Sequence, residues 1–479
     1  MTRSGWIDIL PLIVLAATPV AVMIAVAVRR NMTVSTAITL IGLVASMAML
    51  PIVRTQDNRQ ATPLIVMDNY ALFYVGLLLA SALILVFLSY RYLKEHPGNK
   101  DEYWILLLLA TLGSAVLVAS THFASFFLGL EILSISLYAL IGYNRTSMIG
   151  VEAAIKYLVL AAASTGFLLF GMALVYGQIG SMEFGQIASL HSSLDDGQRV
   201  FFLAGLGLMT VGIGYKLAVV PFHMWAPDVY QGAPAPVTAF IASVSKGGVF
   251  ALLLRFFTQI NFRADDTLFW IFFAIAVASM LAGNLLALLQ NNVKRILAYS
   301  SIAHFGYLLV AFMASGNLRV TAVTLYLIAY FIASTGSFGV ITVLSGPERD
   351  ADRLEDYRGL FWTRPWLAAV FTGMLLSLAG IPLTAGFIGK FYLVAAGAQD
   401  SLWALIIILV TASVISLFYY IRIIVTMYSR PEGEPEAAPT VSQLGSPSEA
   451  IVLVGTSLLA LWLGIYPAAL IHILPSVVH

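Results

Sequence analysis

Long apolar runs alternate with short polar connections along almost the whole chain. Each run has about the 20 residues that an α-helix needs to cross the hydrocarbon core of a bilayer. The pattern therefore predicts fourteen membrane-spanning helices joined mostly by short loops. Their expected ranges are 6–28, 32–53, 68–90, 103–120, 122–142, 149–176, 200–221, 235–257, 267–290, 294–314, 319–344, 365–397, 401–428 and 447–471.

The composition also indicates an all-α polytopic membrane protein, since 60% of the 479 residues are hydrophobic and only 10% are charged. A net charge of +1 gives no indication of a nucleic-acid partner, and the absence of cysteine excludes disulfides and cysteine-held iron–sulfur clusters. We expect one membrane domain over 1–479. Its expected parts are N-terminal helices (1–120), a first repeat core (121–260), a second repeat (267–428), a flexible Pro/Glu-rich loop (429–446) and a last helix (447–479).

Lysine and arginine are distributed unequally between the two sets of loops. Alternation of the spans places fourteen on one side, including Lys294, Arg295 and Arg349, and seven on the other, including Arg255. Because Lys and Arg concentrate in cytoplasmic loops, we expect the richer side to be cytoplasmic. Both termini would then face the outer, periplasmic side of the membrane.

Five charged residues lie well inside the expected spans. The four basic ones are Lys156, Lys216, Lys246 and Lys390, and the acid at a span centre is Glu131. Glu152 precedes Lys156 by four residues, so the two share a helix face. Each lysine at a helix centre costs about 2.5–3.5 kcal/mol on insertion scales, so such residues are retained for a role.

Two spans carry a helix-breaking segment beside a lysine. In Ile213–Asp228, Pro221 removes a backbone donor five residues after Lys216. In Leu378–Phe391, Pro382 and three glycines precede Lys390. A charge beside a break at membrane depth is typical of ion-handling proteins, so we predict discontinuous helices at the seventh and twelfth spans. A packing kink is the plainer interpretation of the second break.

Short matches suggest an internal duplication. Residues 163–166 and 333–336 both read Ala-Ser-Thr-Gly, and 218–221 resembles 379–382. Both pairs lie five spans apart, and an odd offset inverts the second copy. The sequence therefore predicts two inverted five-helix repeats, each with one broken helix.

The choice of lysine over arginine indicates proton transfer, because arginine stays protonated in proteins. Burial lowers the pKa of an amine and a nearby carboxylate raises it, so a lysine that changes partner takes up and releases a proton. We expect Glu131 to be that partner for Lys216, and Lys246 and Lys390 to extend the relay. The alternative is structural ion pairing of Glu131 with Lys216 and of Glu152 with Lys156, which leaves Lys246 and Lys390 without an acid.

Several other polar and aromatic residues have two interpretations. His223 and His304 suit a proton relay, because histidine titrates near neutrality, and suit a structural role equally well. Asp228 is expected to cap or orient the turn before the eighth span. The tryptophans near span ends are expected to be interfacial anchors; they are Trp104, Trp362, Trp366 and Trp403. No Walker loop, dinucleotide fingerprint or metal-ligand cluster is recognisable.

The stretch from Lys216 to Lys246 resembles the antiporter-like membrane subunits of respiratory complex I. The motif Phe222-His-Met-Trp-Ala-Pro-Asp-Val-Tyr-Gln-Gly-Ala-Pro234 is long and specific, and it is most similar to the N-type subunits of bacterial NADH:quinone oxidoreductase. The resemblance covers essentially the whole chain. L-type and M-type subunits and multi-subunit cation/proton antiporters typically have Trp-Leu-Pro-Asp-Ala-His where this chain has Trp225–Tyr230, and M-type subunits have glutamate in place of Lys390.

The resemblance implies a proton-translocating subunit driven by NADH-to-quinone electron transfer in other subunits. It implies that Glu131 and Lys216 form a pair, that Lys246 links, that Lys390 lies at the exit, and that Lys156 matches a further lysine of the N-type. It implies no cofactor on this chain, with NADH, FMN, iron–sulfur clusters and quinone on partner subunits. Expected partners are an M-type subunit and small K-, J- and A-type subunits in the bacterial inner membrane.

Three alternatives stay open. The first is a subunit of a secondary cation/proton antiporter with the same fold, whose signature would read Asp-Ala-His. The second is a purely structural member of the membrane arm. The third is a chloroplast or cyanobacterial relative that uses ferredoxin in place of NADH, since the electron donor binds elsewhere.

Overall fold

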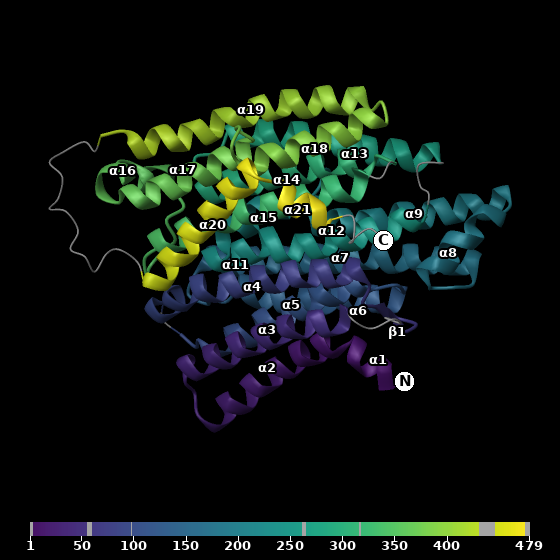
Figure 1. Ribbon diagram of the computed structural model, residues 1–479, viewed down its shortest axis with the longest axis horizontal. Coiled ribbons are helices and arrows are strands. Elements are labelled where there is room, and N and C mark those ends of the chain that lie inside the picture. Colours follow the sequence, from purple (N-terminus) through teal and green to yellow (C-terminus); the bar gives the residue numbers. More distant parts are fainter. Residues whose placement is uncertain are drawn as a thin grey trace.

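The structure is a computed structural model. It describes residues 3–54, 60–96, 98–260, 265–315, 318–430 and 446–474. Most of the expected flexible loop, 431–445, lies outside these ranges. Most described residues lie in helices that run in roughly the same line, across the view in Figure 1. The described strands are β1 (Gln60–Thr62) and β2 (Ile65–Val66), which form a small antiparallel pair.

The helices follow in chain order. The first half contains α1 (Arg3–Asp8), α2 (Leu10–Val28), α3 (Met32–Arg54), α4 (Asn69–Glu95), α5 (Asp101–Ala119), α6 (Phe123–Ile141), α7 (Met148–Ile179), α8 (Phe184–Leu190), α9 (Asp196–Leu217), α10 (Trp225–Gly232), α11 (Ala235–Phe240) and α12 (Lys246–Gln259). The second half contains α13 (Asp266–Leu288), α14 (Val293–Phe312), α15 (Leu318–Leu344), α16 (Leu360–Thr363), α17 (Pro365–Ala379), α18 (Ala385–Gln399), α19 (Trp403–Tyr428), α20 (Pro447–Ile465) and α21 (Ala468–Ile473).

Thirteen helices in the described ranges are long and apolar enough to cross a membrane, counting Ala235–Gln259 as one. The remaining expected span, 365–397, is divided between α17 and α18, which have 15 residues each. The prediction of an all-α polytopic membrane fold is therefore confirmed, while the count of fourteen spans and the inverted repeats stay predictions.

Both predicted helix breaks are present. At the first, α9 ends at Leu217, and Ala218 adopts a left-handed conformation (φ 57°) before α10 begins at Trp225. At the second, α17 ends at Ala379 and left-handed Gly380 (φ 82°) precedes α18. Each break leaves carbonyl groups without helical partners at membrane depth.

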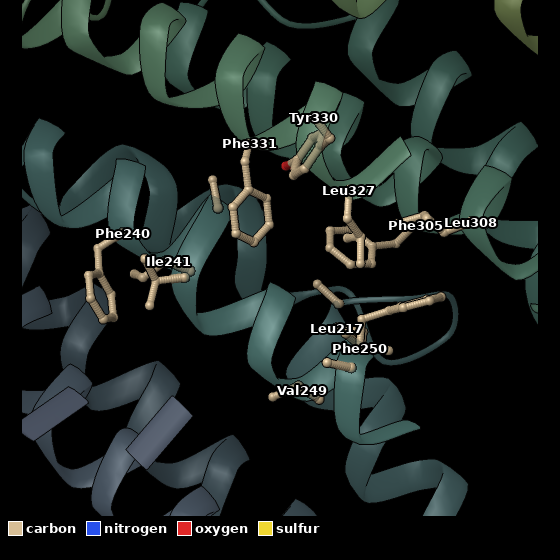
Figure 2. Close-up of a cluster of buried hydrophobic side chains, with 14 of the residues drawn as sticks. Leu217, Phe240, Ile241, Val249, Phe250, Phe305, Leu308, Leu327, Tyr330 and Phe331 are labelled. Atoms are coloured by element: carbon tan, nitrogen blue, oxygen red, sulfur yellow. The ribbon is translucent and has the colours of Figure 1, made fainter. Parts of the chain in front are cut away.

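The centre of the molecule is formed by α11–α12, α14 and α15, the most deeply buried spans. Helices α2 and α3 lie at one edge and α19 at the other (Figure 1). Apolar side chains of the central helices, including Phe250, Phe305, Leu327 and Phe331, form one cluster (Figure 2). A polar group on these helices therefore faces protein and not lipid, so it needs a partner inside the molecule.

A π-helical turn, Ile241–Ser245, joins α11 to α12 and ends directly before Lys246. Such turns are rare and are often found at functional sites.

Candidate proton-transfer site

Lys216 occupies the last turn of α9 and is buried. Its Nζ donates to Ser134 Oγ on α6 at 2.6 Å and lies 5.1 Å from the ring centre of Tyr157 on α7. The C-terminal turn of a helix carries partial negative charge on its free carbonyls, which favours a cation there. The first helix break thus offers a buried ammonium group a favourable position.

Glu131 lies three residues before Ser134 on α6 and is half-buried. It accepts a hydrogen bond from Thr165 Oγ1 at 3.0 Å. No ion pair within 4.0 Å joins it to Lys216 among the described side chains. The expected direct contact is therefore not formed in this structure, because Ser134, one turn further along α6, takes the position beside the lysine.

Lys246 begins α12 and is fully buried. Its Nζ donates to Ser301 Oγ on α14 at 2.7 Å. The same oxygen accepts hydrogen bonds from Tyr330 at 2.8 Å and from Tyr230 at 3.3 Å. No acid pairs with Lys246 among the residues that the structure describes. A neutral hydroxyl takes that place.

One face of α14 carries a row of polar residues at helical spacing. They are Ser300, Ser301, His304 and Tyr307. His304 is buried, with Nδ1 2.6 Å from the Tyr326 hydroxyl and Nε2 3.2 Å from the Tyr420 hydroxyl. Tyr420 also bonds Ser300 Oγ. No described hydrogen bond joins this group to Ser301, but the His304 ring centre lies 5.2 Å from that of Tyr330, whose hydroxyl bonds Ser301.

Lys390 lies in α18, where its Nζ donates to the carbonyl oxygen of Ala379 at 2.8 Å. That carbonyl is at the C-terminal end of α17, so the second break also holds a lysine at a helix end. The ammonium lies 5.2 Å from the ring centre of Tyr307, whose hydroxyl accepts from Asn284 Nδ2 at 2.8 Å. The polar face of α14 therefore extends from the surroundings of Lys246 to those of Lys390.

Lys156 is not part of this buried series. Its side chain is 45% exposed and forms ion pairs with Glu152 at 2.7 Å and with Asp228 at 2.9 Å. Asp228, which lies on α10, also pairs with Arg295 of α14 at 2.8 Å. Its carboxylate therefore links α10 to both α7 and α14. Lys156 lies within the apolar helix α7, as expected, but its side chain faces the outside of this chain beside α10. Its part in the relay stays a prediction.

His223 lies in the first break, and its buried Nδ1 has no hydrogen-bond partner among the described residues. It is not joined to the polar face of α14 by any described contact.

Trp104 is fully buried and packs on Tyr103, so the prediction of an interfacial anchor is wrong for it. Trp362 and Trp403 are exposed, as expected.

Two basic residues assigned to loops are buried in ion pairs. Lys294 Nζ lies 2.7 Å from Asp350 Oδ2, and Arg255 Nη2 lies 2.7 Å from Asp68 Oδ1. The sequence did not indicate these pairs, because each partner comes from a distant segment of the chain. The described parts of the chain contain no group of three or more His, Asp or Glu side chains placed to hold a metal ion.

The sequence matches the family described as "NADH:quinone oxidoreductase/Mrp antiporter, TM" over residues 120–416. It is 51% identical to NADH-quinone oxidoreductase subunit N of Nitrosospira multiformis, over 97% of this chain and 94% of that one. It is 47% identical to the same subunit of Ectopseudomonas mendocina, over 98% and 96%. A chain of the solved respiratory complex I from Thermus thermophilus is 33% identical, with a TM-score of 0.81 over 96% of this chain and 98% of that one. The chain belongs to the NADH:quinone oxidoreductase/Mrp antiporter family of membrane subunits.

Proposed function

We propose that this chain translocates protons through a relay of Glu131, Lys216, Lys246 and Lys390, as a membrane-arm subunit of NADH:quinone oxidoreductase. Electron transfer from NADH to quinone takes place in other subunits and drives the relay. The supporting observation is the buried series of lysines Lys216, Lys246 and Lys390, each held by a neutral group and none, among the described residues, by a carboxylate. An ammonium without a counter-ion in a low-dielectric interior is poised to release its proton.

The contacts suggest how a proton passes from one lysine to the next. Glu131 and Ser134 lie on the same face of α6, so a small change in the Lys216 side chain exchanges a hydroxyl partner for a carboxylate. That exchange favours the protonated amine in one state and the neutral amine in the other. Between Lys216 and Lys246 stand the rings of Tyr157 and Trp225, 4.7 Å apart, so water or a side-chain movement must complete this step.

From Lys246 the hydroxyl and imidazole groups of α14 lead toward Lys390. Ser301 holds Lys246, and the network of Ser300, Tyr420 and His304 continues along the helix. These groups both donate and accept hydrogen bonds, which a proton chain requires. His304 is therefore the better placed of the two candidate histidines, whereas His223 and Lys156 lie beside the route.

We place the side that carries Lys294 and Arg349 in the cytoplasm, and the two termini outside, in a bacterial inner membrane. Neighbouring membrane subunits, an M-type subunit and the small K-, J- and A-type subunits, would cover part of the apolar surface. NADH, FMN, iron–sulfur clusters and quinone would be bound by partner subunits. The exposed Lys156 and Glu152 favour a protein partner over lipid on that face of α7, since exposed charges are costly in hydrocarbon.

The test uses inverted membrane vesicles that contain the whole complex with Lys216→Ala in this chain. After assembly has been checked on a native gel, NADH-driven quinone reduction and acidification are recorded together. We expect both to fall in an assembled complex, while the exposed Lys94→Ala, as a matched control, leaves both unchanged. Wild-type rates in Lys216→Ala would refute the relay. If the wild-type chain does not comigrate with NADH dehydrogenase activity, the secondary cation/proton antiporter becomes the better assignment.

A further inference from the structure

A polar cavity of about 230 Å³ opens where α4 and α10 end and α7 and α14 begin. Its lining includes Tyr92, His96, Gln231, Asp350 and Asp352. The cavity lies on the side that carries the larger share of the loop lysines and arginines. Its volume and polar lining suit several water molecules.

A buried ion pair forms part of the inner wall of this cavity. Lys294 Nζ lies 2.7 Å from Asp350 Oδ2, and the two side chains are 0% and 11% exposed. Lys294 also donates to the carbonyl oxygen of Ala233 at 2.6 Å, and the Tyr92 hydroxyl donates to Asp350 Oδ1 at 2.8 Å. Asp350 thus touches the cavity while the ammonium of Lys294 lies behind it, inside the protein.

Polar groups continue inward from the ammonium. Thr238 Oγ1 lies 3.4 Å from the same Ala233 carbonyl and 3.2 Å from the carbonyl of Tyr230. The hydroxyl of Tyr230, a separate group from this carbonyl, donates to Ser301 Oγ, the oxygen that holds Lys246. No described hydrogen bond joins Lys294 or Thr238 to that hydroxyl, so bridging water must complete this part of the route. Lys294 and Ser301 are seven residues apart on α14, so they share a face and are separated by about 10 Å along the helix axis.

We propose that the Lys294–Asp350 pair is the proton entrance of the relay, which carries protons from the cavity to Lys246 by way of Ser301. This inference rests on the proposed function. An N–H bond of the Lys294 ammonium breaks, and its proton passes through the Tyr230 and Ser301 hydroxyls and bridging water to the free amine of Lys246. Asp350 takes a proton from water in the cavity and passes it to the Lys294 amine, which restores the ion pair.

The type of residue supports a transfer role over a purely structural one. Desolvating two charges is costly, so a buried pair is weak evidence of stabilisation. Arg255 offers a comparison: its side chain is 6% exposed, and it pairs with Asp68, which is 41% exposed. Arginine holds its proton, whereas lysine can release it. The pair beside the polar groups that lead to Ser301 thus contains a lysine, which can release its proton, whereas the Arg255–Asp68 pair contains an arginine, which cannot.

The test distinguishes two properties of Lys294 in the assembled complex, its positive charge and its ability to release a proton. Lys294→Arg keeps the charge and the partner Asp350 but cannot release a proton. We expect a complex that assembles as wild type, with NADH-driven acidification and coupled quinone reduction reduced about a hundredfold, the low end for loss of a positioned proton-transfer group. Wild-type acidification in Lys294→Arg would overturn the proposal.

A second variant keeps the test decisive if the larger side chain of Lys294→Arg prevents the complex from assembling. The double replacement Lys294→Met with Asp350→Asn removes both charges, which is often tolerated where loss of one partner is not. We expect normal assembly with the same loss of acidification, whereas the matched pair Arg255→Met with Asp68→Asn keeps acidification. Restored acidification in the Lys294/Asp350 double variant, or loss of assembly in both Lys294 variants, would show that the pair is structural.

The same experiment distinguishes this inference from the proposed function. If Lys246→Met stops acidification while the Lys294 variants pump normally, the relay holds and the entrance lies elsewhere. If Lys246→Met also pumps normally, the relay itself is wrong.

Discussion

Ser301 on α14 is the shared partner of three donors, so its hydroxyl offers a direct test of the link between Lys246 and the second half of the relay. Ser301→Ala removes the described hydrogen bond of the Lys246 ammonium and the acceptor used by Tyr330 and Tyr230. The replacement is smaller by one atom, so we expect the helix packing around it to be retained.

The magnitude follows from the 2.7 Å contact between Lys246 Nζ and Ser301 Oγ. A hydrogen bond to a charged group contributes about 1.5–3 kcal/mol, and its loss in a buried site is not compensated by solvent. The state in which Lys246 carries the proton therefore rises by that amount. Since each 1.36 kcal/mol changes a rate tenfold, proton transfer through Lys246 should slow by about 10- to 150-fold.

The assay is NADH-driven acidification of inverted vesicles, with quinone reduction recorded on the same samples and assembly checked on a native gel. Ser301→Thr keeps a hydroxyl and should retain most of the rate. Ser337→Ala is the matched control, since the described hydrogen bond of that buried hydroxyl is to the Ala333 carbonyl of its own helix. If Ser301→Ala pumps at the wild-type rate in an assembled complex, the hydroxyl does not carry the step and the reasoning is wrong.

Three further predictions concern the first break, the second break and a loop. Lys216→Arg keeps the charge but holds its proton, so the complex should assemble with acidification lost, and a wild-type rate would contradict the transfer role. Gly386→Ala would drive a Cβ into the backbone oxygen of Ser377, so it should lower the free energy of unfolding by about 1–3 kcal/mol, seen as a lower melting temperature of the complex, while Gly373→Ala, with open space, should not. Burial raises the pKa of Asp356, but its hydrogen bond with Arg349 outweighs this and holds the pKa below its usual value. The pair therefore stabilises its loop above about pH 4 and loses this effect as the pH falls below it. Asp356→Asn should speed amide exchange in 348–358 at pH 7, and the difference from wild type should shrink as the pH falls through the folded-state pKa of Asp356; equal exchange at pH 7 would contradict this.

Much of the fold was predictable because the signals are local. Membrane spans follow from runs of apolar residues, and the two helix breaks follow from Pro221 and from Pro382 with its glycines. The positions of Lys216, Lys246 and Lys390 inside spans also follow from the sequence, since each of these lysines lies within a long apolar run and not in a polar loop. The row of Ser300, Ser301 and His304 at helical spacing was visible as well, and its period could have identified Ser301.

Which groups meet could not be predicted, because helix packing brings together residues far apart in the chain. Ser301 lies 55 positions from Lys246, and Lys294 lies 56 from Asp350. Lys294 counts as a loop charge by alternation of the spans, whereas its partner Asp350 comes from the segment after α15. Glu131 looked like the direct partner of Lys216, but the helix positions bring Ser134 into contact instead.

The sequence by itself determined where the chain crosses the membrane, where two helices break, and which titratable side chains are carried into the interior, because hydropathy and backbone preference act over a few residues. Only the tertiary structure decided which of those side chains are partners, which are exposed, as Lys156 is, and which loop charges are buried. Those outcomes depend on distances of a few ångströms between helices, and no local pattern encodes them.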